Sequence, residues 1–302
     1  MDLFERIAGI ILPVFVIVAM GYGYARLRRD SVRADMVVIN RICMDVLAPL
    51  LVFTALAAKD FDLAHHGELI VAGVLISIGS GVLAWPLARL LGYDVRSFVP
   101  PMMYNNCGNM GLPLAAFAFG PSGLSAAVAL FMASNLVYFS AGIKILESGR
   151  NGASGRFFDF LLNPMMLSML FGTLFAVFHI EVPATLFQPL KLLGETSIPL
   201  MLFALGVRML DINFNSWRIG LIGAAVCPLA GLLTAALLEN LIELTDIQRA
   251  QMYLFASLPP AVFCFVMAER YQQEPNKVAS IVLLGNLASL VFVPLGLWAG
   301  MR

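Results

Sequence analysis

Long apolar runs, separated by short polar or charged breaks, follow one another along the whole chain. An apolar run of about 18 residues or more is typical of a helix that crosses a membrane. Because the first run ends in an arginine-rich segment without a small-residue cleavage site, we expect a retained helix rather than a signal peptide. The pattern predicts ten transmembrane helices, at about residues 6–25, 38–58, 68–91, 98–119, 122–146, 157–179, 186–209, 217–239, 248–269 and 277–300.

The predicted helices divide evenly around residues 147–156, a polar and glycine-rich stretch that is the only linker-like segment of the sequence. Five helices precede this linker in residues 1–146, and five follow it in residues 157–302. Because each half holds an odd number of helices, the second half enters the membrane upside down relative to the first. We therefore expect two repeats joined by a cytoplasmic linker.

The two halves are also similar in sequence. Residues 45–53 align with residues 195–203 at an offset of 150, and Asn135 aligns with Asn286 at an offset of 151. Two matches at nearly one offset, in helices of equal rank, indicate an internal repeat. The predicted fold is an all-α polytopic membrane protein, a 5+5 inverted repeat of ten transmembrane helices.

Basic residues are distributed unequally between the two sets of connections. The connections after the odd-numbered helices, taken with the adjoining helix ends, hold fourteen of the nineteen Lys and Arg residues, and the other side holds five. Lys and Arg concentrate in cytoplasmic loops. The expected location is therefore the cell (inner) membrane, with both termini outside.

The composition excludes several classes of function. Hydrophobic residues make up 60% of the chain and charged residues 13%, and ten spans of about 20 residues leave no room for a soluble catalytic domain. The 19 Lys and Arg residues balance 19 Asp and Glu residues, which argues against nucleic acid as a partner. The four cysteines show no metal-ligand or CxxC spacing, so we expect no metal, cofactor or disulfide.

The fourth predicted helix contains a segment that a continuous lipid-facing helix would not tolerate. Proline lacks the backbone donor of a helical residue, and glycine adopts conformations that other residues avoid. Broken backbone at membrane depth persists only where it is buried in protein or lines a wet cavity. A packing kink is the alternative, but the density of polar residues favours a discontinuous helix at a binding site. The substrate-binding candidates here are Asn105, Asn106, Asn109, Gly111 and Pro113.

The ninth predicted helix is interrupted at the equivalent rank by Ser257, Pro259 and Pro260. Proline suits the first turn of a helix, so Pro113 and Pro260 are each expected to open a second half-helix. Each half-helix N-terminus carries unpaired N–H groups and about half a positive charge. Two such ends that meet near the bilayer midplane predict a site for an anion without a buried Arg or Lys.

Four further polar residues are candidates for supporting or ion-coupling roles. Asn135 and Asn286 lie within the fifth and tenth predicted helices and are expected to brace the broken segments or to face the site. The alternative is that each asparagine only hydrogen-bonds a neighbouring helix. Asp45 and Glu195 are the ionisable residues nearest to hydrocarbon, but both lie within about two turns of a predicted helix end, which favours an interfacial position. Na⁺ coupling through neutral oxygens and H⁺ coupling through the two carboxylates both stay open.

Residues 105–114 resemble the fourth-helix signature of the auxin efflux carrier family of membrane transporters. Residues 256–261 with 266–271 are similar to the ninth helix of that family, and residues 49–53 to its second. The resemblance implies a secondary transporter with a fold akin to the sodium–bile-acid symporters. Helices 1, 2, 6 and 7 would then form a scaffold, and helices 3–5 with 8–10 a transport domain that carries the crossing broken helices.

The resemblance also implies a class of substrate. Bacterial relatives are associated with malonate, malate and other small organic acids, and plant members export auxin, a carboxylate. The chain lacks the long cytoplasmic loop of the plant members, and its ninth helix has no asparagine beside the prolines. The expected partners are a small organic anion, the lipid bilayer and, as a further candidate, a second copy of the chain.

Two alternatives belong to other classes of protein. A cation–proton exchanger of related inverted-repeat fold would require carboxylates at the breaks, where the sequence has asparagines. A receptor that binds without transport is compatible with the same sequence. An enzyme is not expected, because the predicted spans contain no Ser/His pair, paired carboxylates or metal-ligand set.

Overall fold

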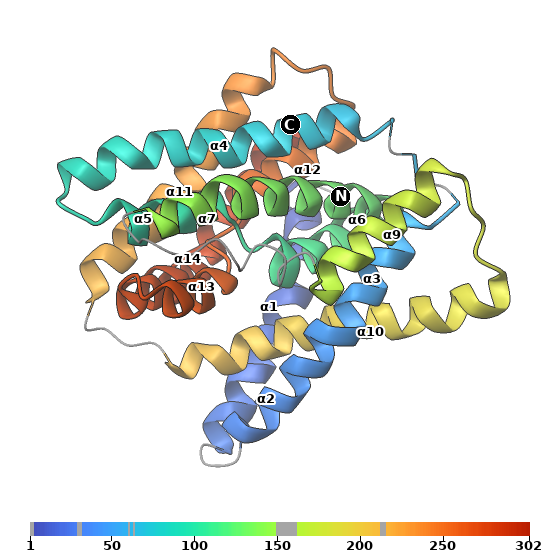
Figure 1. Ribbon diagram of the computed structural model, residues 1–302, viewed down its shortest axis with the longest axis horizontal. Coiled ribbons are helices and arrows are strands. Elements are labelled where there is room, and N and C mark those ends of the chain that lie inside the picture. Colours follow the sequence, from blue (N-terminus) through green and yellow to red (C-terminus); the bar gives the residue numbers. More distant parts are fainter. Residues whose placement is uncertain (1–2, 29–31, 60, 63, 149–161, 212–215) are drawn as a thin grey trace.

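The computed structural model describes residues 3–28, 32–59, 61–62, 64–148, 162–211 and 216–302. Within this part of the chain, helices are the only regular elements apart from one isolated β-bridge (Figure 1). The first half contains α1 (Leu3–Leu27), α2 (Val32–Ile42), α3 (Ala48–Leu56), α4 (Gly67–Leu90), α5 (Val95–Met103), α6 (Leu112–Val137) and α7 (Ile143–Glu147). The second half contains α9 (Pro164–Val177), α10 (Ala184–Arg208), α11 (Trp217–Leu238), α12 (Asp246–Ala256), α13 (Phe263–Tyr271) and α14 (Pro275–Met301). Three single π-helical turns, η1 (Cys43–Leu47), η2 (Cys107–Gly111) and η3 (Tyr138–Gly142), and one 3₁₀ turn, η4 (Met209–Asp211), continue these helices.

Seven helical stretches are long and apolar enough to cross a membrane, which confirms an all-α polytopic protein for the described residues. The seven are Glu5–Leu27, Met36–Leu56, Gly67–Leu90, Gly123–Glu147, Ala184–Arg208, Trp217–Leu238 and Pro275–Met301. The other three predicted spans also contain helix. Two of them are interrupted, and the third is α9, preceded by residues 157–161, which lie outside the described part.

Local sequence signals explain where several helices begin. Asn163 caps α9 by accepting a hydrogen bond from the Met165 N–H at 2.9 Å, and the proline that follows it suits the first helical turn. Thr245 and Gln248 form a reciprocal capping box at the start of α12. Gly120 adopts a φ of 68° inside α6, a conformation that favours glycine, and the fourth and fifth predicted spans meet at this kink.

The helices pack in two groups. In the first group α10 contacts α1 and α3, and α3 contacts α9; α3, α9 and α10 come together on the right of Figure 1. In the second group α4 contacts α5, α6 and α11, and α14 contacts α11 and α12. The two groups are joined by contacts of α1 with α6 and α14 and by contacts of α10 with η2.

Contacts between connections follow the predicted alternation of sides. Arg96, after the third predicted helix, donates to the Ser148 carbonyl after the fifth at 3.4 Å. On the other predicted side, the Gln248 amide donates to the His65 carbonyl at 2.8 Å, and an exposed ion pair joins Lys59 to Glu181 at 2.7 Å. Each of these contacts joins connections that the basic-residue pattern places on one side of the membrane.

The two carboxylates that are candidates for ion coupling both lie within long helical stretches. Asp45 lies in the π-helical turn η1 near the middle of the span Met36–Leu56, and Glu195 lies near the middle of α10. Both residues are exposed, and Glu195 lies 3.8 Å from Lys191 one turn earlier in α10.

Candidate functional site

The two interrupted segments lie against each other. Asn105, after α5, and Pro260, after α12, form an antiparallel β-bridge. The Asn106 N–H donates to the Pro259 carbonyl at 2.6 Å, and the Ala261 N–H donates to the Tyr104 carbonyl at 2.9 Å. Backbone groups that leave a helix inside an apolar structure require new partners. Each broken segment therefore supplies hydrogen bonds that the other has lost.

The second half-helices begin at residues that differ from the predicted ones. After residues 104–106 the helix resumes at Cys107 as η2 and continues into α6, so Pro113 lies in the second turn and does not open the half-helix. In the other segment α13 resumes at Phe263, and Pro260 belongs to the bridge. The prediction failed because proline at a first turn is a preference, whereas pairing between the two segments decides where helical hydrogen bonding stops.

Asn286 of α14 connects the two broken segments. Its side-chain oxygen accepts a hydrogen bond from the Asn106 Nδ2 at 2.7 Å, and its own Nδ2 donates to the Pro260 carbonyl at 3.3 Å and to the Val282 carbonyl at 2.8 Å. Asn106 is 2% exposed and Asn286 is 1% exposed, so water does not compete for these bonds. Both residues thus hold the two breaks together.

Asn135 of α6 occupies the corresponding place in the first half. The Tyr104 hydroxyl donates to the Asn135 Oδ1 at 2.9 Å, and the Asn135 Nδ2 donates to the carbonyl one turn earlier, at Phe131, at 2.7 Å. Tyr104 also stacks on the buried Tyr138 ring with centroids 4.3 Å apart. Both repeat-related asparagines therefore contact a break.

Asn109 differs from the other two asparagines of its segment. It lies in the first turn of η2 and is half-buried, whereas Asn105 and Asn106 are buried. Within the described residues, no backbone carbonyl accepts a hydrogen bond from the N–H groups of Gly108 and Asn109. First-turn N–H groups lack partners inside their own helix and attract anions. Asn109 is therefore the one asparagine of this segment that is partly exposed, and it lies at the start of the second half-helix.

Two other predicted site residues have structural roles. The Ser257 hydroxyl is fully buried and donates to the Leu254 carbonyl at 2.8 Å. A Cβ on Gly111 would lie 2.8 Å from the Leu258 Cδ1, so a larger residue would require the Leu258 side chain of the second broken segment to move. Neither residue presents a free polar group.

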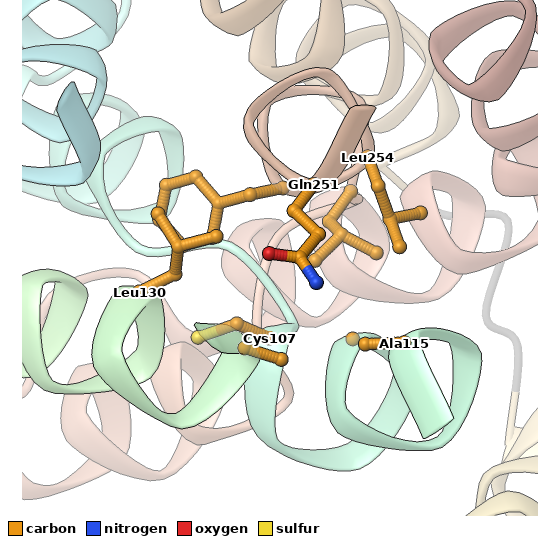
Figure 2. Close-up of a pocket in the computed structure, with 9 residues that line it drawn as sticks. Cys107, Ala115, Leu130, Gln251 and Leu254 are labelled. Atoms are coloured by element: carbon orange, nitrogen blue, oxygen red, sulfur yellow. The ribbon is translucent and has the colours of Figure 1, made fainter. Parts of the chain in front are cut away.

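A pocket beside η2 contains a polar residue that the sequence pattern had not singled out. The side chain of Gln251 from α12 extends into this pocket, opposite Cys107 and Ala115 (Figure 2). Gln251 is 2% exposed, and its Oε1 has no hydrogen-bond partner among the described residues. A side-chain amide six residues before Ser257, in an apolar run, is the signal that could have identified it.

Asn105 lies beside a second pocket. Its Nδ2 donates to the Phe255 carbonyl at 2.6 Å, which leaves the Oδ1 as the buried atom without a partner in the described structure. The pocket is also lined by Ser77 and Ser80 of α4. The described residues contain no cluster of three His, Cys, Asp or Glu side chains that could hold a metal ion.

Discontinuous helices that meet within a bundle of apolar helices are typical of secondary transporters. The family described as membrane transport protein matches residues 7–154 and 158–297. The chain belongs to this family, the auxin efflux carrier family of membrane transporters.

Similar proteins align with the chain over nearly its whole length. An uncharacterized transporter of Methanothermobacter thermautotrophicus is 26% identical, over 94% of this chain and 95% of its own. A protein of Rhizobium meliloti with the description "Putative malonate transporter" is 25% identical, over 95% of this chain and 94% of its own. An uncharacterized transporter of Methanocaldococcus jannaschii is 19% identical, over 96% and 97%.

Proposed function

We propose that the protein is a secondary active transporter that moves a small organic anion, a mono- or dicarboxylate such as malonate, by alternating access. The observation that carries the proposal is the pairing of the two broken segments through Asn105 and Pro260 inside a membrane transport protein. A packing kink would need only one bent helix. Two breaks that satisfy each other's backbone groups form a binding region at the place where substrate sites of transporters lie.

An inverted repeat of five plus five helices is part of the proposal. Asn135 and Asn286, 151 positions apart, each donate to the carbonyl four residues earlier and each contact the break of their own half, at Tyr104 and Pro260. The breaks also follow equivalent helices, α5 and α12. This equivalence supports ten spans, with the fourth and ninth crossing at the breaks.

The electrostatics of the breaks favour an anion. η2 begins two residues after the bridge residue Asn105, and α13 begins three residues after the bridge residue Pro260. Each of these N-termini carries about half a positive charge. Neither pocket beside the breaks is lined by Arg or Lys. Helix ends and the half-buried Asn109 would therefore hold the carboxylate of the substrate, and the name of the Rhizobium meliloti relative suggests malonate as the first compound to test.

The two groups of helices correspond to two moving parts in this proposal. The group of α1, α3, α9 and α10 serves as the scaffold, and the group that carries the breaks serves as the transport domain. The α10–η2 contact places a scaffold helix beside the candidate site. Relative movement of the two groups would expose the site to each side of the membrane in turn.

Uptake by purified protein in liposomes tests the proposal. Liposomes loaded with malonate should accumulate external radiolabelled malonate by exchange, and protein-free liposomes should not. Unlabelled carboxylates such as malate should compete, whereas the neutral malonamide should not. Malonate binding without exchange would favour a receptor, and failure of all small carboxylates to bind or exchange would contradict the proposal.

A cation–proton exchanger is the weaker candidate. Exchange of this kind requires a titrating carboxylate at the crossing. The residues that line the two pockets include no Asp or Glu. Proton movement driven by a Na⁺ or K⁺ gradient, without any organic anion, would be the result in its favour.

A further inference from the structure

The second pocket lies where the first halves of both broken helices end. Met102 and Met103 close α5, and Ala256 closes α12; all three line this pocket. The last carbonyl groups of a helix have no partner within it, and the C-terminus carries about half a negative charge. Two negative helix ends thus converge on one small space.

Several neutral oxygen atoms surround this space. The Asn105 side chain is 8% exposed, its Nδ2 is fixed on the Phe255 carbonyl, and its Oδ1 accepts no hydrogen bond from the described residues. Ser77 and Ser80, each 3% exposed, lie one turn apart on α4 and line the same pocket. These groups are buried oxygens of the kind that a cation binds.

A main-chain oxygen adds to the set. The Ala256 carbonyl oxygen lies so close to α11 that a Cβ on Gly231 would meet it at 2.2 Å. Glycine at this position lets α11 approach the end of α12, and both residues line the pocket. The pocket therefore combines an amide oxygen, two hydroxyls and a helix-end carbonyl.

We propose that this pocket, between the ends of α5 and α12 and the serines of α4, is a binding site for a sodium ion. Unwound carbonyls and half-helix C-termini coordinate monovalent cations in transporters, while half-helix N-termini face the anionic substrate. The cation and the anion would thus lie on opposite sides of the paired segments. The role of this ion as the coupling ion rests on the proposed anion transport, whereas its binding does not.

The ligand set selects a small monovalent cation. Ca²⁺ and Mg²⁺ sites depend on carboxylates, and no Asp or Glu lines the pocket. Transition metals prefer thiolate and imidazole ligands, and Cys227 is the one such residue in the lining, with its thiol directed to the Pro101 and Leu258 carbonyls. Neutral oxygens at the negative ends of two helices suit Na⁺.

Thermal unfolding of the purified protein, without any organic anion, tests the site. All four cysteines are buried, so a thiol-reactive fluorescent dye reports unfolding. The unfolding temperature is followed as NaCl replaces choline chloride at constant ionic strength, with KCl as a second series. We expect a saturable rise with Na⁺, and a rise with K⁺ only at concentrations at least tenfold higher.

Three variants identify the pocket as the origin of the effect. The double variant Ser77→Ala, Ser80→Ala should weaken the apparent Na⁺ affinity at least tenfold. Each single substitution should weaken it at least threefold, so the single variants provide the test if the double variant does not fold. Ser197→Ala is the matched control, because its fully buried hydroxyl is bonded to the Gly194 carbonyl in α10. It should keep the parent's Na⁺ response.

The outcomes separate this site from the proposed transport. The sodium site is overturned, even if malonate exchange occurs, by any of three results. These are no response of the parent's unfolding temperature to Na⁺, an equal response to K⁺, or a Na⁺ response that is unchanged in the serine variants. A sodium response that weakens in the serine variants and persists in Ser197→Ala supports it, even if malonate proves to be the wrong substrate. Malonate accumulation driven by an imposed Na⁺ gradient then establishes coupling.

Discussion

The hydrogen bond between Asn106 and Asn286 provides a quantitative test of how the two breaks are held together. Replacing Asn286 with leucine, a side chain of similar size, removes the acceptor of the Asn106 Nδ2 and the donor to the Pro260 carbonyl. Both asparagines are almost completely buried, so neither stranded group reaches water. The change therefore leaves two buried polar groups without partners.

The expected magnitude follows from these two groups. An unsatisfied buried donor or acceptor costs about 1–3 kcal/mol, so Asn286→Leu, which strands two such groups, should lower the free energy of unfolding by about 2–6 kcal/mol. Asn106→Leu strands only the Asn286 Oδ1 and should cost about 1–3 kcal/mol. An average interhelical hydrogen bond in a membrane contributes only about 0.6 kcal/mol, so the two situations are distinguishable.

A double-mutant cycle separates the bond from other effects of the substitutions. The double variant strands only the Pro260 carbonyl, so its cost should be smaller than the sum of the single costs by the cost of two stranded groups, about 2–6 kcal/mol. Unfolding would be measured by titration with a denaturing detergent in mixed micelles. Ser289→Ala is the control, since its buried hydroxyl binds the Asn286 carbonyl and should cost about 1 kcal/mol. Additive single costs, within about 0.3 kcal/mol, would refute the bond.

Three further predictions use other parts of the structure. Pro259→Ala restores a backbone donor beside the bridge and should reduce malonate exchange at least tenfold without loss of expression. Pro113→Ala, within the helix that continues from η2 into α6, should change malonate exchange less than threefold. Equal effects of the two substitutions would contradict the assigned breaks. Burial lowers the pKa of His66, in the connection before α4, so below about pH 6.5 the unfolded chain binds more protons than the folded protein. The unfolding temperature should therefore fall between pH 7 and pH 5.5, and His66→Leu should flatten this dependence. In a cysteine-free background, a cysteine at Glu181 should react with an impermeant reagent added to intact cells and one at Ser148 should not; the reverse pattern would invert the topology.

The sequence predicted the helical architecture well, because its strongest signal is hydrophobic length. Each predicted span contains helix in the structure, and the two proline- and glycine-containing segments are interrupted as expected. Asn135 and Asn286 were linked by a repeat offset, and the structure places both against the breaks. Polar residues inside long apolar runs are few, so each one is informative.

Features that depend on contacts between distant segments were predicted less well. The Asn105–Pro260 bridge joins residues 155 positions apart, and no local preference indicates it. The starts of η2 and α13 follow from this bridge, which explains why the assignment to Pro113 failed. Gln251 was missed because its neighbours within α12 give no sign of the pocket that its side chain enters.

Binding of malonate to Asn109 variants tests the central claim, that an anion occupies the site formed by the two breaks. At an effective dielectric constant of about 20, a carboxylate about 4 Å from the substrate's carboxylate costs about 4 kcal/mol. Asn109→Asp preserves the shape of the side chain, so calorimetry at pH 8 should show malonate affinity reduced more than about a hundredfold. Asn109→Ala should lose about 1 kcal/mol, roughly fivefold. If the Asn109→Asp variant binds malonate as tightly as the parent at pH 8, that result would contradict the claim.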